Sequence, residues 1–262
     1  GYGWSPDKPL ATIDYAIGLC TANQGDVIVV LPGHAETINT AGGITCDKAG
    51  VTILGLGQGE DRPSITIGSS LDTATILISA ADVMLKNLVL VPGNDGVDIL
   101  VDINADGAIL EDVELRSDET NAYQADTYVD INGGGANAAA RVTLRRVKIR
   151  SLTAGAANGI EIGAVEDDVR IEDCDIDGDF SAAGIHSASI FTNMVLARNI
   201  IRNRNSGDHA VEFSAAGTGQ AVGNYLFGDT AAAIFDPGSL FCAGNHIAQA
   251  IDQESLDIIP LI

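Results

Sequence analysis

Apolar and polar residues alternate in short segments along the chain, and these segments recur. The pattern reads apolar, any, apolar, any, any, small or apolar, any, apolar. Alternation with a period of two is typical of a β-strand, since a helix places its apolar residues three or four positions apart. The third residue of successive copies falls at positions 53, 85, 110, 144, 171, 196, 221 and 242. The chain is therefore expected to repeat one strand-containing unit.

A second strand segment recurs in the same rhythm, with its third residue at positions 78, 103, 131, 162, 187 and 213. A repeat of about 25 residues with short strands predicts a coil of a parallel β-helix. Leucine-rich repeats share the period but require a Leu-rich consensus and a helix in each unit, and both are absent. We expect an all-β fold, a single parallel β-helix of about eight coils, right-handed by the rule for parallel crossovers.

The two ends are predicted to cover the open coils. Residues 10–22 fit a short amphipathic helix, with Leu10, Ile13, Ile17 and Leu19 partly on one face. Such a helix would shield the first coil, whose exposed backbone edge could otherwise recruit other strands. The expected organisation is an N-terminal segment with a capping helix (1–24), the β-helix (25–250) and a C-terminal cap or docking tail (251–262).

One inward column of the repeat changes from apolar residues to asparagine along the chain. Asparagines stacked at a bend can hydrogen-bond along the axis and satisfy the backbone of the turn. We interpret Cys174 as a core residue and the last three positions as a structural ladder. The column reads Leu88, Val113, Val147, Cys174, Asn199, Asn224 and Asn245.

Two segments resemble the pectate-lyase-like superfamily of right-handed parallel β-helix proteins. Residues 184–203 look like its parallel β-helix repeat, and residues 11–17 with 25–33 resemble its capping helix and first strand. Residues 5–9, before Thr12-Ile13-Asp14, are similar to the start of many phage-encoded β-helix proteins. The resemblance implies the fold, but a fold does not determine an activity.

The middle residues of the second strand form an outward column that is mostly acidic. We take Glu161 and His186 as its centre, with Asp130 and Glu212 one coil further out and Asp102 beyond them. Neighbouring coils are about 4.8 Å apart, and glycosidases hold two carboxyl groups about 5–9.5 Å apart. Crowded carboxylates also raise one another's pKa. The alternative is a solvated acidic stripe without chemistry.

No cofactor is predicted, and the four cysteines lie too far apart for a zinc site. Ca²⁺ is the one cation that the acidic column would suit, through its oxygen ligands. The pectate-lyase resemblance implies a basic residue beside such a cluster, and Arg198 and Arg202 are the candidates. The ordered motifs of polygalacturonases are absent, because Asp167-Asp168 and Gly33-His34 occur alone and in the wrong order.

Other outward columns contain apolar residues and predict a partner surface. Met84, Ile109, Val195 and Phe241 share one column, and Val89, Ile200 and Tyr225 share another, with Phe227 beside it. Rods with such stripes can associate side by side into closed rings. We expect a homo-oligomer, with a trimer favoured because phage spikes that resemble this fold are trimers.

The net charge of −22, from 14 Lys and Arg against 36 Asp and Glu, disfavours nucleic acid as a partner. Apolar runs are strand-sized, so no membrane span is expected. Two functions remain. The first is a non-enzymatic structural or attachment protein of a phage particle, a head decoration, spike or fibre module that contacts other virion proteins or a surface glycan. The alternative is an extracellular polysaccharide lyase or glycoside hydrolase that uses the acidic column.

Overall fold

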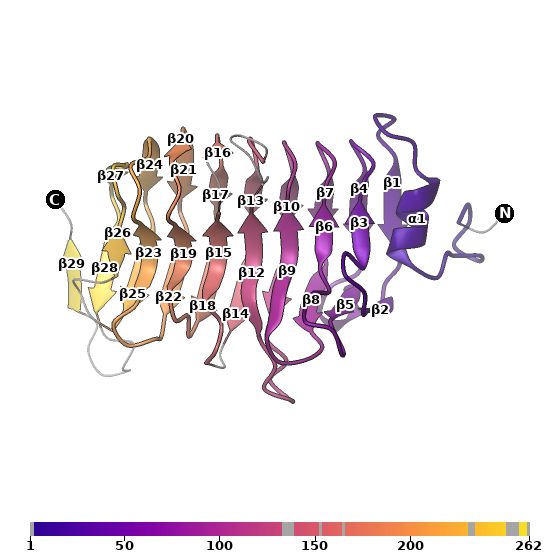
Figure 1. The fold of residues 1–262 in the computed structure, drawn as a ribbon, viewed down its shortest axis with the longest axis horizontal. Coiled ribbons are helices and arrows are strands. Elements are labelled where there is room, and N and C mark those ends of the chain that lie inside the picture. Colours follow the sequence, from indigo (N-terminus) through magenta and orange to yellow (C-terminus); the bar gives the residue numbers. More distant parts are fainter. Residues whose placement is uncertain are drawn as a thin grey trace.

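The computed structural model describes residues 3–132, 139–151, 154–163, 166–229, 234–249 and 257–260. These residues form a right-handed parallel β-helix, a rod of about eight coils with one short α-helix at its N-terminal end (Figure 1). The predicted fold class is confirmed. No helix within the described residues is long and apolar enough to cross a membrane.

Each coil contributes one short strand to each of three parallel sheets. Sheet A contains β1 (Val27–Val30), β4 (Thr52–Gly55), β7 (Met84–Lys86), β10 (Ile109–Glu111), β13 (Thr143–Arg145), β17 (Arg170–Glu172), β21 (Met194–Ala197), β24 (Gly219–Val222) and β27 (Phe241–Ala243). Sheet B contains β2 (Ala35–Ile38), β5 (Ser64–Ile67), β8 (Val89–Pro92), β11 (Glu114–Arg116), β14 (Lys148–Ser151), β18 (Asp175–Gly178), β22 (Ile200–Asn203), β25 (Tyr225–Gly228), β28 (His246–Gln249) and β29 (Asp257–Pro260).

The third sheet, sheet C, contains β3 (Ile44–Cys46), β6 (Ile76–Ile78), β9 (Val97–Ile103), β12 (Ala125–Ile131), β15 (Asn158–Ile162), β19 (Ala183–Ser187), β23 (His209–Phe213) and β26 (Phe235–Asp236). A two-stranded sheet pairs β16 (Glu166–Asp167) with β20 (Phe191–Thr192), and a 3₁₀ turn, η1, spans Gly59–Asp61. The pairing in all three large sheets is parallel, except that β29 runs antiparallel to β28. The C-terminal strand therefore covers the last strand of sheet B.

The core runs without a break from the helix to the last coils. Every second residue of each strand points inward, and on sheet C the inward residues include Val101, Val129, Ile160, Ile185 and Val211, all fully buried. This alternation is the period of two seen in the sequence. The apolar interiors of successive coils thus form one continuous core along the rod.

The N-terminal helix α1 (Ile13–Leu19) is shorter than the expected 10–22. Thr12 caps it by accepting a hydrogen bond from the backbone N–H of Tyr15, and the chain is extended again at Cys20. Ile13 and Ile17 are buried as predicted, whereas Leu19 is exposed. The prediction for Leu19 was wrong because Leu19, like Tyr15, lies on the side of the helix opposite Ile13 and Ile17.

The asparagine ladder is present at the bend between sheets A and B. The backbone N–H of Asn199 donates to Oδ1 of Asn224 at 3.0 Å, and that of Asn224 donates to Oδ1 of Asn245 at 3.0 Å. Cys174 is buried, and its N–H donates to Oδ1 of Asn199. The ladder satisfies buried backbone groups that a turn would otherwise leave without partners.

The residue before each ladder position has a positive φ, which is uncommon outside glycine. The φ value is 55° at Asn87, 57° at Asp112, 52° at Arg146, 56° at Asp173 and 57° at Arg198. The backbone N–H at this position donates to a carbonyl of the next coil, as from Asp173 to Ala197 at 3.0 Å. The hydrogen bonds along the rod offset the strain of this conformation.

Candidate functional site

The outward position of sheet C carries the predicted acidic column in continuous register. Each residue is the direct strand partner of the next, one per coil, so that Glu161 lies between Asp130 and His186. Asp236 extends the column by one coil beyond the expected residues. We call these residues the acid column: Asp102, Asp130, Glu161, His186, Glu212 and Asp236.

His186 joins two carboxylates at the centre of the acid column. Its Nδ1 lies 2.6 Å from Oε2 of Glu161, and its Nε2 lies 3.8 Å from Oε2 of Glu212. The hydrogen bond with Glu161 and the charges of Glu161 and Glu212 raise the pKa of His186, although burial opposes them. Glu161 therefore holds the imidazole in one orientation and favours its charged form.

Asp130 is the carboxyl group that the site perturbs most. Burial, followed by the charges of Asp102 and Glu161, raises the pKa of Asp130 to about 7, against a smaller lowering by a hydrogen bond with Asn132. Oδ1 of Asp130 is buried without a hydrogen-bond partner among the described residues. Burial also raises the pKa of Asp102, and Asn104 partly offsets this by donating to it at 3.0 Å. Near neutral pH Asp130 can thus both hold and release a proton next to the Glu161–His186 pair.

Three neighbours of the acid column were missed from the sequence. Asn104 and Asn132 each follow an aspartate of the column by two residues, which puts them on the same face of the strand. Nδ1 of His209 lies 3.9 Å from Oε2 of Glu212, three residues along β23. The repeated Asp-Ile-Asn at 102–104 and 130–132 was the available signal for the two asparagines.

No group of three or more His, Cys, Asp or Glu residues is placed to hold a metal ion within the described ranges. The suggestion that Ca²⁺ binds the acid column therefore stays a prediction.

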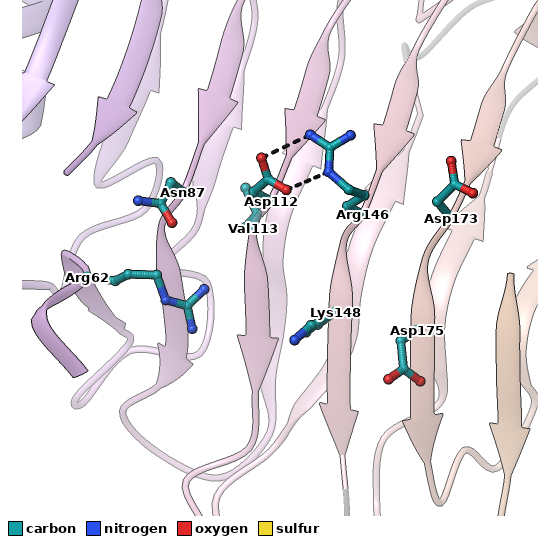
Figure 2. Close-up of a pocket in the computed structure, with 8 residues that line it drawn as sticks. All are labelled: Arg62, Asn87, Asp112, Val113, Arg146, Lys148, Asp173 and Asp175. Atoms are coloured by element: carbon teal, nitrogen blue, oxygen red, sulfur yellow. Dashed lines mark hydrogen bonds and ion pairs between the residues drawn. The ribbon is translucent and has the colours of Figure 1, made fainter. Parts of the chain in front are cut away.

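A groove of about 460 Å³ runs along the bend between sheets A and B, away from the acid column (Figure 2). Figure 2 shows Asp112 and Arg146 joined across neighbouring coils. Lys148 lies on the strand that follows Arg146, and Asp175 lies on the matching strand of the next coil. The Asp112–Arg146 contacts are 2.7 and 3.0 Å. The groove is lined by Arg62, Asn87, Asp112, Val113, Arg146, Lys148, Asp173 and Asp175.

Charge alternates from coil to coil along this side of the rod. The coil with β10 and β11 places acids at 111, 112 and 114, and the next places bases at 145, 146, 148 and 150. The following coil has acids at 172, 173, 175 and 177, and the next has bases at 198, 202 and 204. Ion pairs cross each boundary, as between Arg150 and Asp175 at 2.8 Å and between Arg204 and Asp177 at 2.7 Å. These four coils are therefore joined to one another electrostatically.

Glu111 is the most enclosed member of these ion pairs. Its side chain is only 5% exposed, and it contacts Lys86 at 2.5 Å, Arg146 at 2.9 Å and Arg145. Hydrogen bonds from Lys86 and Arg145 lower the pKa of Glu111 to about 2. This carboxylate links the coils before and after its own.

Arg198 and Arg202, the candidate bases, belong to this side of the rod and not to the acid column. Arg198 pairs with Asp173 at 2.7 Å. Arg202 pairs with Asp175 at 2.9 Å and lies over the ring of Phe227 at 5.3 Å. Sheets A and B separate both guanidinium groups from the carboxylates of sheet C. Neither arginine is therefore placed to act with the acid column.

The apolar outward columns are shorter than the sequence suggested. Met84, Ile109, Val195 and Phe241 do share a column, but Thr143, Arg170 and Gln220 interrupt it. In the second column Val89 is buried, and Glu114, Lys148 and Asp175 separate it from Ile200 and Tyr225. Phe241 is 68% exposed and Tyr225 48%, whereas Met84, Ile109 and Val195 are half-buried. A continuous apolar stripe is absent from these described columns because charged residues fill the middle coils.

Comparisons with known proteins give little beyond the architecture. No model of a known family matches the chain, and no curated protein matches it. One solved structure, of a protein described as a rhamnogalacturonan lyase, is similar over 92% of this chain and 84% of its own, with a TM-score of 0.44 and 11% sequence identity. This likeness carries no conclusion about the family or the activity of the chain.

Proposed function

We propose that the chain is a non-enzymatic structural or attachment module of a larger particle, such as the head decoration, spike or fibre of a phage. This proposal rests on one observation. Charged outward side chains on sheets A and B form ion pairs with charges on neighbouring coils. Such pairs run along the rod rather than converging on one point. Together with the continuous core, they suit a rigid spacer.

The distribution of exposed apolar side chains supports attachment through the N-terminal end. Among the described residues, ten large hydrophobic side chains are exposed; six of them fall within residues 4–56, and Trp4 is 90% exposed. Tyr15 and Leu19 project from the outer side of α1, opposite the buried Ile13 and Ile17. Exposed apolar surface of this kind is typical of a protein contact.

The phage assignment rests on the resemblance of residues 5–14 and is tested by locating the protein. Particles from a culture of the source organism are banded in a density gradient, and fractions are probed with an antibody against the purified chain. We expect the chain to band with intact particles and to stay there after a high-salt wash. Its recovery only in the soluble fractions would overturn the proposal.

A second function is favoured by the geometry of the acid column. A protonated Asp130 beside the Glu161–His186 pair supplies an acid and a carboxylate on neighbouring coils, whose spacing of about 4.8 Å is close to that of retaining glycosidases. In this reading Asp130 donates the proton to the leaving oxygen, and Glu161 acts as the base or nucleophile. The protein would then be an extracellular glycoside hydrolase or polysaccharide lyase.

The two functions are separated by a panel of acidic and neutral polysaccharides. New reducing ends or unsaturated products that disappear in Glu161→Gln, but persist in Glu60→Gln outside the acid column, would establish the enzyme. We expect no products from the native protein. A purified chain that cleaves any member of the panel contradicts the non-enzymatic proposal directly.

A further inference from the structure

Sheets A and B carry a positive surface on a strongly acidic protein. Five middle coils contain ten Lys and Arg and seven Asp and Glu in their strands and bends on these sheets. The segments are residues 84–92, 109–116, 143–151, 170–178 and 194–204. We call this surface the charged face. The whole chain has 14 Lys and Arg against 36 Asp and Glu. Most of its basic residues are thus gathered in one place.

Sheet C is the opposite case. Its strands contain seven Asp and Glu and neither Lys nor Arg. Glu161 is 21% exposed and Glu212 29%, while Asp98, Asp126 and Asp236 are exposed. The two surfaces have opposite net sign. The acids of sheet C recur on neighbouring coils, whereas the basic coils of the charged face recur on every second coil.

Several cations of the charged face remain available to a partner. Lys148 is exposed and makes no ion pair within the described residues, because its strand neighbours Glu114 and Asp175 are already paired with arginines. The side chains of Arg116 and Arg198 are also 52% and 58% exposed. An acidic partner could contact these groups without disrupting the pairs between coils.

From this complementarity we infer that the charged face of one copy packs against sheet C of a second copy. Strands on both surfaces recur at the same spacing of about 4.8 Å, so the basic coils of one rod can lie opposite acidic strands of a parallel rod. The contact joins two different surfaces, so the pair keeps one free surface of each kind, and further copies can close a ring. This inference deepens the structural proposal and rests on it, since the contact would cover the acid column.

The ionic strength should control this association in two opposing ways. Net charges of −22 repel one another over the Debye length, which is about 10 Å at 0.1 M salt and about 30 Å at 0.01 M. Ion pairs in direct contact between the two copies are weakened only at higher salt, where the Debye length falls to about 3 Å at 1 M. Association should therefore be strongest near 0.1 M and weaker on both sides.

Light scattering and sedimentation of the full chain at 0.1 M salt test the contact. We expect a mass above the 27.0 kDa of one chain, rising with concentration. Lys148→Glu should weaken association at least tenfold. Lys48→Glu, the matched control near the N-terminal end, makes the same change in net charge outside both surfaces and should leave association unchanged.

A mixing experiment identifies the two surfaces. Lys148→Glu keeps an intact sheet C, and Asp126→Lys keeps an intact charged face, so each variant should be monomeric alone while an equimolar mixture forms a 1:1 pair. Circular dichroism confirms that both variants are folded. The inference is overturned if the native chain stays at 27.0 kDa at every salt and protein concentration, if the two lysine variants behave alike, or if the mixture stays monomeric. None of these results alters whether the chain bands with particles, so a failure here is distinct from a failure of the structural proposal.

Discussion

At the scale of single residues, Asp130 shows how the stacking of coils creates an unusual acid. Its strand partners Asp102 and Glu161 are themselves acidic, and its Oδ1 is buried. Each residue alone is an ordinary outward side chain of a strand. Burial, and after it the like charges that their register brings together, raises the pKa of Asp130 to about 7.

We expect Asp130→Asn to flatten the pH dependence of stability between pH 5 and pH 7. The ordinary pKa of Asp is 3.8 and that of folded Asp130 is about 7, so within this window the folded chain retains a proton that the unfolded chain releases. Stability should then fall as the pH rises. The measurement is the melting temperature across this range. The exposed control Asp47→Asn should keep the native slope, and an unchanged slope in Asp130→Asn would contradict the pKa assignment.

At the scale of elements, the bend between sheets A and B combines an internal ladder with external ion pairs. Inside the bend, Nδ2 of Asn224 donates to the carbonyl of Leu196 at 2.9 Å and to Asn245 at 2.9 Å. Outside it, Asp173 and Arg198 pair across the coils. The same two-residue bend thus joins neighbouring coils on both its surfaces.

Removing one amide from the ladder should be costly. Asn224→Ala leaves the carbonyl of Leu196 and the N–H of Asn199 buried without their partners and opens a small cavity. We expect a loss of about 3 kcal/mol in the free energy of unfolding, measured by chemical denaturation. The exposed Asn121→Ala should change it by less than about 0.5 kcal/mol. Equal effects of both substitutions would show that the ladder contributes nothing specific.

Glu111→Gln should weaken the links between coils, by about 2 kcal/mol for hydrogen bonds to a charged group. The pKa of Glu111 lies near 2, below its ordinary 4.5. Its contribution is therefore present above pH 4.5 and is lost as the pH falls toward 2. Denaturation of the native chain and the variant at pH 7 and pH 3 checks this, since the difference between them should shrink in acid. Asp168→Asn, which removes a half-buried partner of Arg170 within the same coil, should have a small effect at both pH values.

The repeat allowed much of this structure to be predicted. Strand alternation, the register of the acid column and the Asn199–Asn224–Asn245 ladder all follow from positions that recur once per coil. The alternating charges were missed because they appear only when whole coils are compared, and the step from Glu111 to Arg145 is longer than the usual repeat. Burial of Val89 and the early end of α1 depend on packing between segments, which periodicity does not describe.

At the scale of the whole molecule, the rod has a continuous core but two different ends. The α-helix covers the first coil, and β29 pairs with the last strand of sheet B. Coils in the middle have neighbours on both sides, whereas terminal coils have one. In such a stack, stability is the sum of the coils and of the contacts between neighbours.

Hydrogen exchange should therefore be slowest in the middle of the rod. We expect the amides of β12 and β15 to exchange at least tenfold more slowly than those of β1 and β27, because opening a central coil breaks hydrogen bonds to two neighbours. Exchange followed by mass spectrometry measures this. Uniform protection along the rod would indicate instead that the chain opens only by global unfolding.

The alternation of acidic and basic coils also limits how such a rod can change in length. Deleting the basic coil of Arg145 and Arg146 would set Glu111 and Asp112 against Glu172 and Asp173, so that acid meets acid. Deleting that coil and the acidic coil after it would instead bring the same acids opposite the coil of Arg198. In this part of the molecule, coils should therefore be gained or lost only in pairs. This requirement comes from the charges and not from the backbone repeat.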